Sequence, residues 1–314
     1  MKVRPILHRM YFSRNCYRNV CLLLLAFFMV ETGFSQVKRE RRAQSSFKWV
    51  NKKAYMNTPG VLHRTFRSPS MNVNVGYYIY LPLAYEREQK RRFPVVYYLH
   101  GGRPGSEAKA VKLAEYIHAN QSSPVIYVFV NGGPVSHYNL PDRENAMGED
   151  VFITELIPHI DDAYRTIGNR SGRGLEGFSQ GGRGTARIMF KHPHLFCSAA
   201  PGGGGFETEK RISEENGRES AGLVFAPGYN AWDLARSYAE TEVPSLRRLI
   251  FVGTEGFNYE NNLAYMKFLE SLGIPFERLI VEGVGHNAVA IYEKCGKEIM
   301  NFHAESFKQA ERDR

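Results

Sequence analysis

Short, nearly continuous apolar runs alternate with longer amphipathic segments from residue 60 onward. The runs are rich in β-branched and aromatic residues, and such runs are typical of strands that are buried on both faces of a parallel sheet. We therefore predict strands at Val73–Leu81, Phe93–Leu99, Val125–Val130, Gly174–Ser179, Leu249–Val252 and Arg278–Val281.

The segments between these runs carry apolar residues at helical spacing. Phe152, Leu156, Ile160 and Ala163 recur three or four residues apart and predict a helix, which Pro158 must kink or split. Further helices are predicted at Ser106–Ala119, at about Gly181–Lys191 and around Leu263, Met266 and Leu269. Alternating strands and helices without a repeat indicate a single α/β domain, from 61 to 314, with a mostly parallel central sheet flanked by helices.

The first 35 residues have the pattern of a secretory signal peptide. Five basic residues precede the apolar run Val20–Val30, and Gly33 and Ser35 supply the small residues of a cleavage site. An uncleaved membrane anchor is the alternative, but a run this short does not span a hydrocarbon core of about 30 Å. We therefore expect a secreted or periplasmic protein without a stable membrane span, in which residues 36–60 form a basic linker ahead of the domain.

The positive charge of the chain is concentrated at its N-terminal end. Residues 1–53 hold 12 of the 41 Lys and Arg residues and 2 of the 32 Asp and Glu residues, so the rest of the chain is nearly neutral. The net charge of +9 therefore does not indicate a basic groove through the folded domain. We expect no nucleic-acid partner, because binding to a phosphate backbone needs such a groove.

Two cysteines lie beyond the predicted signal peptide, Cys197 and Cys295. They fit one disulfide in an oxidising compartment and equally two buried thiols, and both alternatives stay open. His192, His194 and Cys197 are close enough in sequence to suggest a metal site, but Pro193 and the lack of a fourth ligand nearby favour a turn that ends a helix. With no P-loop and no dinucleotide-binding glycine motif, we expect neither a metal nor a cofactor.

The strongest candidate for chemistry is the segment Gly177-Phe-Ser179-Gln-Gly181. In a G-x-S-x-G motif the serine occupies a strained turn between a strand and a helix, and the glycines let neighbouring backbone pass close to it. The motif alone is weak evidence, because a Gly-rich turn can match it by chance. Here a predicted strand precedes it and a predicted helix follows it, so Ser179 is the candidate nucleophile.

Two further segments supply the groups that a nucleophilic serine needs. His100-Gly101-Gly102 follows a predicted buried strand, and a backbone N–H there stabilises an oxyanion together with the N–H of the residue after the serine. Gly102 and Gln180 are therefore the candidate oxyanion donors, and His100 is interpreted as a structural residue of the turn. His286 lies on a loop after the last predicted strand and is the candidate general base.

An ordered set of motifs runs from about Val61 to Ser306. It consists of Tyr80-Leu-Pro82, Tyr98-Leu-His-Gly-Gly102, Glu155-Leu-Ile-Pro-His-Ile-Asp161 with Tyr164-Arg165, Gly177-Phe-Ser-Gln-Gly-Gly182, His192-Pro-His-Leu-Phe196 and Gly285-His286. As a set, these motifs resemble the esterase D type of α/β-hydrolases, which include feruloyl and acetylxylan esterases, S-formylglutathione hydrolases, enterochelin esterases and mycolyltransferases. The resemblance implies the α/β-hydrolase fold, a serine nucleophile at Ser179, a histidine base at His286 and the oxyanion donors named above.

One position departs from the pattern of this family. Relatives usually carry an aspartate that orients the histidine, three residues after the glycine of a turn that reads Gly253-Thr-Glu-Gly256 in this chain. Gly256 stands in its place, so Glu255 is the candidate substitute through its longer side chain, and Glu260 is a more distant candidate. Both also fit ordinary surface carboxylates. Loss of the acid can cost roughly 10⁴-fold in kcat without abolishing catalysis.

Two classes of function follow. The leading hypothesis is a secreted serine carboxylesterase, with feruloyl or acetyl esters on carbohydrate favoured by export together with the resemblance. The alternative is a secreted ligand-binding homologue that keeps the fold but has little turnover, because it lacks the usual acid. In either class the partner is a small-molecule or carbohydrate ester; the sequence does not separate hydrolysis from acyl transfer and does not indicate an oligomeric state.

Several aromatic residues lie in loops predicted near the active face and fit a role in stacking on a substrate ring, or equally a role in packing. Asp233 is interpreted as the N-cap of a helix rather than as a catalytic acid. The aromatic residues are Tyr138, Phe206, Tyr229, Trp232 and Phe257.

Overall fold

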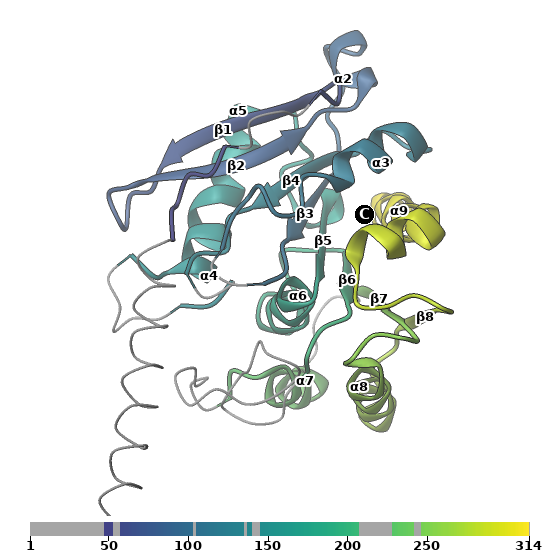
Figure 1. Ribbon diagram of the computed structural model, residues 1–314. Helices are drawn as coiled ribbons and strands as arrows, with labels where there is room; N and C mark the ends of the chain where they lie inside the picture. Colours follow the sequence, from purple (N-terminus) through teal and green to yellow (C-terminus); the bar gives the residue numbers. More distant parts are fainter. Residues whose placement is uncertain are drawn as a thin grey trace, which may run out of the picture. The chain divides into compact units, whose positions relative to one another are not determined.

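Strands far apart in the sequence form one eight-stranded sheet in the computed structural model (Figure 1). The structure describes residues 47–52, 57–102, 105–134, 137–139, 145–206, 228–241 and 246–313. The sheet order is β1-β2-β4-β3-β5-β6-β7-β8; β1 and β4 each pair with β2 in antiparallel fashion, and the neighbours from β4 to β8 are parallel. The strands are β1 Val61–Arg67, β2 Asn74–Tyr80, β3 Val95–Leu99, β4 Ile126–Val130, β5 Arg173–Phe178, β6 Ser198–Gly202, β7 Arg247–Gly253 and β8 Glu277–Val281. The predicted α/β architecture with a mostly parallel sheet is confirmed.

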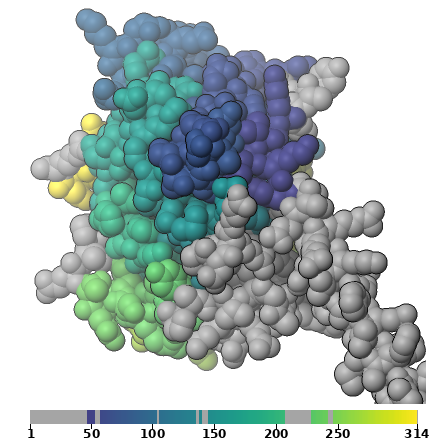
Figure 2. Space-filling model, turned by 90° about the vertical axis from the view of Figure 1, so that its left-hand side faces the viewer, coloured from purple at the N-terminus to yellow at the C-terminus, as the bar shows by residue number. Residues whose placement is uncertain are grey.

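Helices cover both faces of the sheet. They are α2 Leu83–Arg87, α3 Leu113–Asn120, α4 Gly148–Asp150, the π-helix η1 Val151–Leu156, α5 Ile157–Ala163, the 3-10 helix η2 Arg170–Gly172, α6 Gln180–Lys191, α7 Ala231–Ala239, α8 Tyr259–Ser271 and α9 Ala288–Arg312. One apolar cluster packs α3 and α9 on one face, and another packs η1, α5, α6, α7 and α8 on the opposite face. Figure 2 shows one side of the molecule. The purple and blue N-terminal strands lie at one end of this side, and the green α7 region lies at the other end.

The parallel strands end at a common edge, where the candidate residues follow them. Leu99 at the end of β3 pairs with Gly177 near the end of β5, and Gly253 at the end of β7 pairs with Val281 at the end of β8. In open α/β sheets, ligands bind outside the carboxyl ends of the strands. The fold therefore brings the segments after β3, β5, β7 and β8 to the edge where a site is expected.

Two strands are not marked by the apolar pattern. β6 has the sequence Ser-Ala-Ala-Pro-Gly and is fully buried between β5 and β7. Its neighbours pack closely on it: a Cβ on Gly202 would lie 2.0 Å from the ring of Phe251 on β7, and a Cβ on Gly182 of α6 would lie 2.2 Å from the carbonyl oxygen of Gly202. β1 is an edge strand whose side chains are mostly exposed or half-buried, so no buried run predicts it.

Two predicted helices take a different form in the structure. α3 begins at Leu113 rather than at Ser106, since Glu107 turns inward and its carboxylate accepts hydrogen bonds from the Asn51 N–H and the Asn131 amide. The helix around Pro158 is divided: η1 is π-helical, and Pro158 lies in the first turn of α5, where a missing N–H costs least.

The compact unit that contains the sheet begins before the predicted boundary at residue 61. Trp49 is buried in the core, and its carbonyl accepts a 2.6 Å hydrogen bond from the Gly76 N–H. The described residues 47–52 of the predicted linker 36–60 therefore belong to the domain. The predicted signal peptide, residues 1–35, lies outside the described residues, and within the described part of the chain no helix is both long and apolar enough to cross a bilayer.

Candidate active site

Ser179 lies in a strained turn between β5 and α6. Its backbone has φ 61° and ψ −116°, a conformation that is uncommon for any residue other than glycine. The glycines on either side are required sterically, because a Cβ on Gly181 would lie 1.8 Å from the carbonyl oxygen of Leu99 and a Cβ on Gly177 would lie 2.5 Å from the backbone of Gly181. The segment therefore folds into a strand-to-helix turn that presents the half-buried serine at the edge of the sheet.

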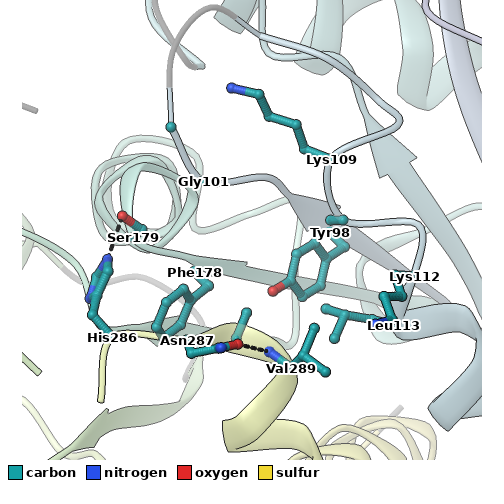
Figure 3. Close-up of a pocket in the computed structure, with 13 residues that line it drawn as sticks. Tyr98, Gly101, Lys109, Lys112, Leu113, Phe178, Ser179, His286, Asn287 and Val289 are labelled. Atoms are coloured by element: carbon teal, nitrogen blue, oxygen red, sulfur yellow. Dashed lines mark hydrogen bonds between the residues drawn. The ribbon is translucent and has the colours of Figure 1, made fainter. Parts of the chain in front are cut away.

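The imidazole of His286 lies directly beside this serine. His286 follows β8, and the next residue, Asn287, fixes the start of α9 by accepting hydrogen bonds from the N–H groups of Val289 and Ala290. Nε2 of His286 is 2.8 Å from Oγ of Ser179 (Figure 3). The structure thus brings the predicted nucleophile and the predicted base into hydrogen-bond contact.

Two aromatic rings pack against the imidazole of His286, and its burial affects its pKa. Its ring centroid is 4.8 Å from that of Phe178 and 4.3 Å from that of Phe257. Burial disfavours the charged imidazolium and lowers the pKa of His286 below its usual value. At neutral pH the ring is therefore uncharged, which is the state that a general base needs.

The turn after β3 forms the other side of the site. Gly102 has φ +70°, which favours glycine, and a Cβ on Gly101 would lie 3.1 Å from Cβ of Ser179. Gln180 is the first residue of α6, where helix N–H groups have no acceptor within the helix. The turn and the helix start thus both lie next to Ser179, which suits the two predicted oxyanion donors.

His100 holds this turn in place. Its Nε2 accepts hydrogen bonds from the N–H groups of Ser106 and Gly132, both at 3.2 Å, and its Nδ1 is 3.1 Å from the carbonyl oxygen of Gly101. Burial, with a contribution from the nearby Lys109 charge, lowers the pKa of His100 to about 3. His100 therefore stays neutral and bridges three backbone groups, a structural arrangement.

Neither Glu255 nor Glu260 occupies the place of the usual acid. Nδ1 of His286 is buried and has no hydrogen-bond partner among the described residues. The side chain of Glu255 is exposed, and its backbone N–H donates to the carbonyl of Val284 at 3.0 Å. Glu260 is also exposed, on α8. The structure thus brings neither candidate carboxylate to the imidazole.

Asn258 is a residue at this place that the sequence motifs do not single out. It is 6% exposed, its Nδ2 donates to the carbonyl of Gly203, and its Oδ1 has no partner among the described residues. That Oδ1 lies 3.5 Å from the position that a Cβ on Gly256 would occupy. The only signal in the sequence is its position two residues after Gly256.

A pocket of about 310 Å³ opens beside Ser179. Its residues come from the end of β3, the segment leading into α3, the Ser179 turn and the start of α9 (Figure 3). Aromatic and aliphatic side chains form much of its wall, and two lysines also line it. The lining residues include Tyr98, Lys109, Lys112, Leu113, Phe178 and Val289.

The other residues singled out in the sequence lie elsewhere or act structurally. Of the five loop aromatics, Phe257 is the one that contacts His286; it is 58% exposed, whereas Phe206 is fully buried and stacks on Tyr265. The N-cap of α7 is Asn230 and not Asp233, because the Asn230 side chain accepts from the N–H groups of residues 232 and 233.

The two histidines and the one cysteine that suggested a metal site make other contacts. Nε2 of His192 is 3.1 Å from the carboxylate of Glu149, and the Cys197 thiol lies near backbone carbonyls. Cys197 and Cys295 are both free thiols. Among the described residues, no group of three His, Cys, Asp or Glu side chains is arranged to hold a metal ion.

Comparison with protein-family models and with curated sequences shows that this chain is similar to esterases. A family model described as "Putative esterase" matches residues 68–208. An esterase of Mycobacterium tuberculosis is 29% identical over 259 residues, which cover 73% of this chain and 56% of that protein. An endo-1,4-beta-xylanase/feruloyl esterase of Xylanibacter ruminicola is 27% identical over 261 residues, 76% of this chain and 31% of that protein. The chain thus spans about half or less of the length of these relatives, and its resemblance to the esterase family is confirmed.

Solved structures agree on the fold. A ferulic acid esterase superimposes with a TM-score of 0.63 at 20% identity, covering 78% of this chain and 98% of that one. An S-formylglutathione hydrolase of Agrobacterium tumefaciens gives a TM-score of 0.64 at 15% identity, covering 79% and 95%. The chain therefore has the α/β-hydrolase fold that the motifs imply.

Proposed function

We propose that this chain is a serine esterase that cleaves carboxylic esters through an acyl-enzyme on Ser179. The observation that carries the proposal is the 2.8 Å contact between Ser179 Oγ and His286 Nε2, at a serine held in a strained strand-to-helix turn. The esterase names of the family and of the relatives support the same class of reaction.

The reaction has two halves. In the first, Ser179 Oγ attacks the ester carbonyl carbon while its proton passes to Nε2 of His286, and the N–H groups of Gly102 and Gln180 stabilise the oxyanion. His286 then gives the proton to the leaving alcohol oxygen, and the alcohol departs. In the second half, water transfers a proton to His286 and attacks the acyl carbon. The acid leaves, and the proton returns to Ser179.

This chemistry runs on a serine–histidine pair whose imidazole has no carboxylate partner among the described residues. Without a carboxylate, the imidazolium that forms during attack is less stabilised and the ring is held less firmly. The serine turn and the oxyanion donors still act, so we expect slow but genuine turnover.

Feruloyl or acetyl esters on carbohydrate are the substrates we favour within this class. The xylanase/feruloyl esterase relative and the ferulic acid esterase structure support this choice by name. The pocket supports it physically, since the rings of Tyr98 and Phe178 line a volume of about 310 Å³ that suits a small aromatic acyl group.

Export is part of the proposal and rests on the N-terminal pattern of basic residues, an apolar run and small residues. Cleavage after Ser35 leaves a protein that begins at Gln36. N-terminal sequencing of protein recovered outside the cytoplasm tests this, and a start at Met1 would contradict it.

The second candidate function is a ligand-binding homologue with little turnover. Gly256 and the unpartnered Nδ1 of His286 favour it, because together they remove the group that usually orients the base. In that case the pocket would bind an ester or an acid without cleaving it.

Hydrolysis of p-nitrophenyl acetate separates the two candidates. This small activated ester tests the machinery without presuming the natural substrate. If the wild type releases p-nitrophenol above background and Ser179→Ala does not, the esterase proposal holds. If both folded proteins match the background, the binding function takes its place.

A further inference from the structure

The imidazole of His286 has one ring nitrogen that its contact with Ser179 does not occupy. Nε2 lies 2.8 Å from Ser179 Oγ, and Nδ1 is turned away from the serine (Figure 3). For Nε2 to accept the serine proton, the single N–H of the neutral ring must be on Nδ1. This N–H group is buried and meets no acceptor among the described residues. A buried donor needs an acceptor, and the acceptor fixes which nitrogen carries the hydrogen.

Asn258 presents the complementary group. Its side chain is 6% exposed, and its Oδ1 is buried and has no hydrogen-bond donor in the part of the chain that the structure describes. The two ends of this amide are not interchangeable, because Nδ2 donates to the carbonyl oxygen of Gly203 and an oxygen in its place would face another oxygen. Oδ1 is therefore the end of the side chain that is left for a second partner.

Both groups adjoin Gly256. Oδ1 of Asn258 is 3.5 Å, and the backbone nitrogen of His286 is 3.9 Å, from the position that a Cβ on Gly256 would occupy. Nδ1 is the ring nitrogen nearer to this backbone nitrogen. Gly256 is buried and brings no side chain of its own to this place. A buried donor and a buried acceptor thus lie beside the same glycine without bonding to each other directly.

The start of α8 holds Asn258 in this position. The carbonyl of Asn258 accepts hydrogen bonds from the backbone N–H of Asn262 at 3.0 Å and from its side-chain Nδ2 at 2.8 Å. The same Nδ2 donates to the carbonyl of Gly204 at 2.7 Å. The N-cap of α8 is therefore tied to the segment after β6, and the Asn258 side chain is preorganised beside Gly256.

We propose that Asn258 is a positioning residue for His286, and that one bound water beside Gly256 joins them by accepting from Nδ1–H and donating to Asn258 Oδ1. The carbonyl oxygen of Gly253, 3.1 Å from the same Cβ position, is the acceptor for the second hydrogen, so the water has three polar partners. This uncharged bridge fixes the tautomer and the orientation of the ring, but it does not stabilise the imidazolium by charge. The proposal rests on the serine esterase function proposed above and adds a residue and a water site to it.

The tautomer of His286 tests the role of Asn258 directly. In protein with isotopically labelled histidine, NMR distinguishes a ring nitrogen that carries a hydrogen from one that does not, and the His286 signals are those lost in His286→Ala. At neutral pH we expect the hydrogen on Nδ1 in the wild type. In Asn258→Ala it should be on Nε2 in a measurable fraction of molecules, because Nδ1 has lost its acceptor. The same position in both proteins, or a wild type with the hydrogen on Nε2, would overturn the proposal.

Activity should change in the same direction. Asn258→Ala should lower kcat for p-nitrophenyl acetate about fivefold, the effect of one hydrogen bond of ordinary strength, with little change in KM. Asn258→Asp should recover this loss, because it keeps the acceptor although it gives up the bond to Gly203. The matched control is Asn261→Ala, since Asn261 lies on the same helix and its Oδ1 already accepts from the Phe206 N–H at 2.6 Å. An equal loss in this control, or no recovery in Asn258→Asp, would count against a positioning role.

Two substitutions at position 256 test the water. Alanine and serine place the same Cβ beside the Gly253 carbonyl, so any shift of the turn is common to both. The serine hydroxyl can replace the water, accepting from Nδ1–H and donating to Asn258 Oδ1, whereas the alanine methyl displaces it without replacing its hydrogen bonds. Gly256→Ser should therefore have a kcat about fivefold above that of Gly256→Ala and keep the hydrogen on Nδ1. Equal kcat and equal tautomers in the two variants would overturn the water bridge.

The outcomes separate this inference from the function it builds on. The tautomer is observed without turnover, so a wild type that hydrolyses no ester but responds to Asn258→Ala by NMR loses the esterase function and keeps the bridge. An active wild type in which Asn258→Ala changes neither kcat nor the tautomer keeps the esterase function and loses the bridge.

Discussion

Two serine–histidine contacts adjoin strand β5, and they differ in solvent access, in backbone geometry and in the presence of an acid. At the end of the strand, Ser179 Oγ lies 2.8 Å from Nε2 of His286. Three residues earlier, Glu176 belongs to a cluster in which Ser198 Oγ lies 2.8 Å from Nδ1 of His303 and Nε2 of His303 lies 3.5 Å from the Glu176 carboxylate. The second cluster contains serine, histidine and acid together, and the first has no acid beside its histidine among the described residues.

Access and backbone geometry distinguish the two. Ser198, His303 and Glu176 are each 0% exposed, and Ser198 lies within the regular strand β6. Ser179 is half-buried, sits at φ 61° and adjoins the Gly101–Gly102 turn. A triad recognised by residue types alone would be assigned to the buried cluster; a pocket, a strained turn and the candidate oxyanion donors favour the site proposed at Ser179.

The largest expected effect is the loss of activity on removing the Ser179 hydroxyl. Ser179→Ala should lower kcat for p-nitrophenyl acetate by roughly 10³-fold or more, because no other group takes the acyl chain. Ser198→Ala is the matched control, and the folded protein should keep its kcat. Steady-state assays on both variants decide between the two serines, and equal losses in both would remove the distinction drawn here.

The buried cluster should contribute to the stability of the fold and not to the rate of ester cleavage. Glu176→Ala should lower the free energy of unfolding by about 3 kcal/mol, because it opens a cavity and strips partners from His303 and from the Tyr292 hydroxyl, which donates to Glu176 at 2.6 Å. Glu176→Gln keeps an acceptor for Tyr292 and should cost less. Urea unfolding measures both, and a loss under about 1 kcal/mol in the alanine variant would show that the cluster is not stabilising.

Introducing a carboxylate at position 256 should raise the rate at which Ser179 and His286 cleave the ester. Gly256→Asp should raise kcat about tenfold, since a carboxylate near Nδ1 stabilises the imidazolium that forms during attack. Gly256 is not among the positive-φ glycines, but a Cβ there would lie 3.1 Å from the carbonyl oxygen of Gly253, so this turn must shift by a few tenths of an ångström to admit the side chain. Gly256→Asn has nearly the same shape without the charge. An equal gain in both variants would assign the effect to packing.

The smallest expected effect is on the pH dependence. Neutral His286 is the active form, and burial lowers its pKa, so kcat/KM should rise with pH through an apparent pKa below the usual histidine value and then level off. In Gly256→Asp the carboxylate favours the charged ring, which should move the rising limb to higher pH. Profiles that coincide for the two proteins would show that the new carboxylate does not reach the imidazole.

Short stretches of sequence predict much of the fold and the pair formed by Ser179 and His286. Apolar runs such as Phe93–Leu99 predict the central strands, because both faces of these strands are covered. Ser179 and His286 are predictable from short motifs and chain order, since a glycine-flanked turn and a loop after the last strand have recognisable sequences. β6 is not predictable in this way, because its small residues reflect close packing of neighbouring elements, such as the ring of Phe251 on β7 against Gly202.

The rest of the site depends on the direction of side chains in space. Glu255 is adjacent to Gly256 in the sequence, yet its side chain is exposed, while Asn258 turns inward toward the place of the acid. The reach of Lys109 toward Gly102 depends on where the chain between β3 and α3 folds. Neither Asn258 nor Lys109 belongs to a local sequence pattern, so the structure is needed to find them.

The most direct test of the central claim is mass spectrometry of the intact protein after reaction with a fluorophosphonate. This reagent reports on an activated serine whether or not the natural ester is known. We expect one adduct per chain, located by peptide mapping at Ser179 and absent from Ser198, which disappears in Ser179→Ala and forms more slowly in His286→Ala. An unlabelled wild-type protein, or labelling that persists at the same rate in Ser179→Ala, would contradict the assignment of Ser179 as a nucleophile activated by His286.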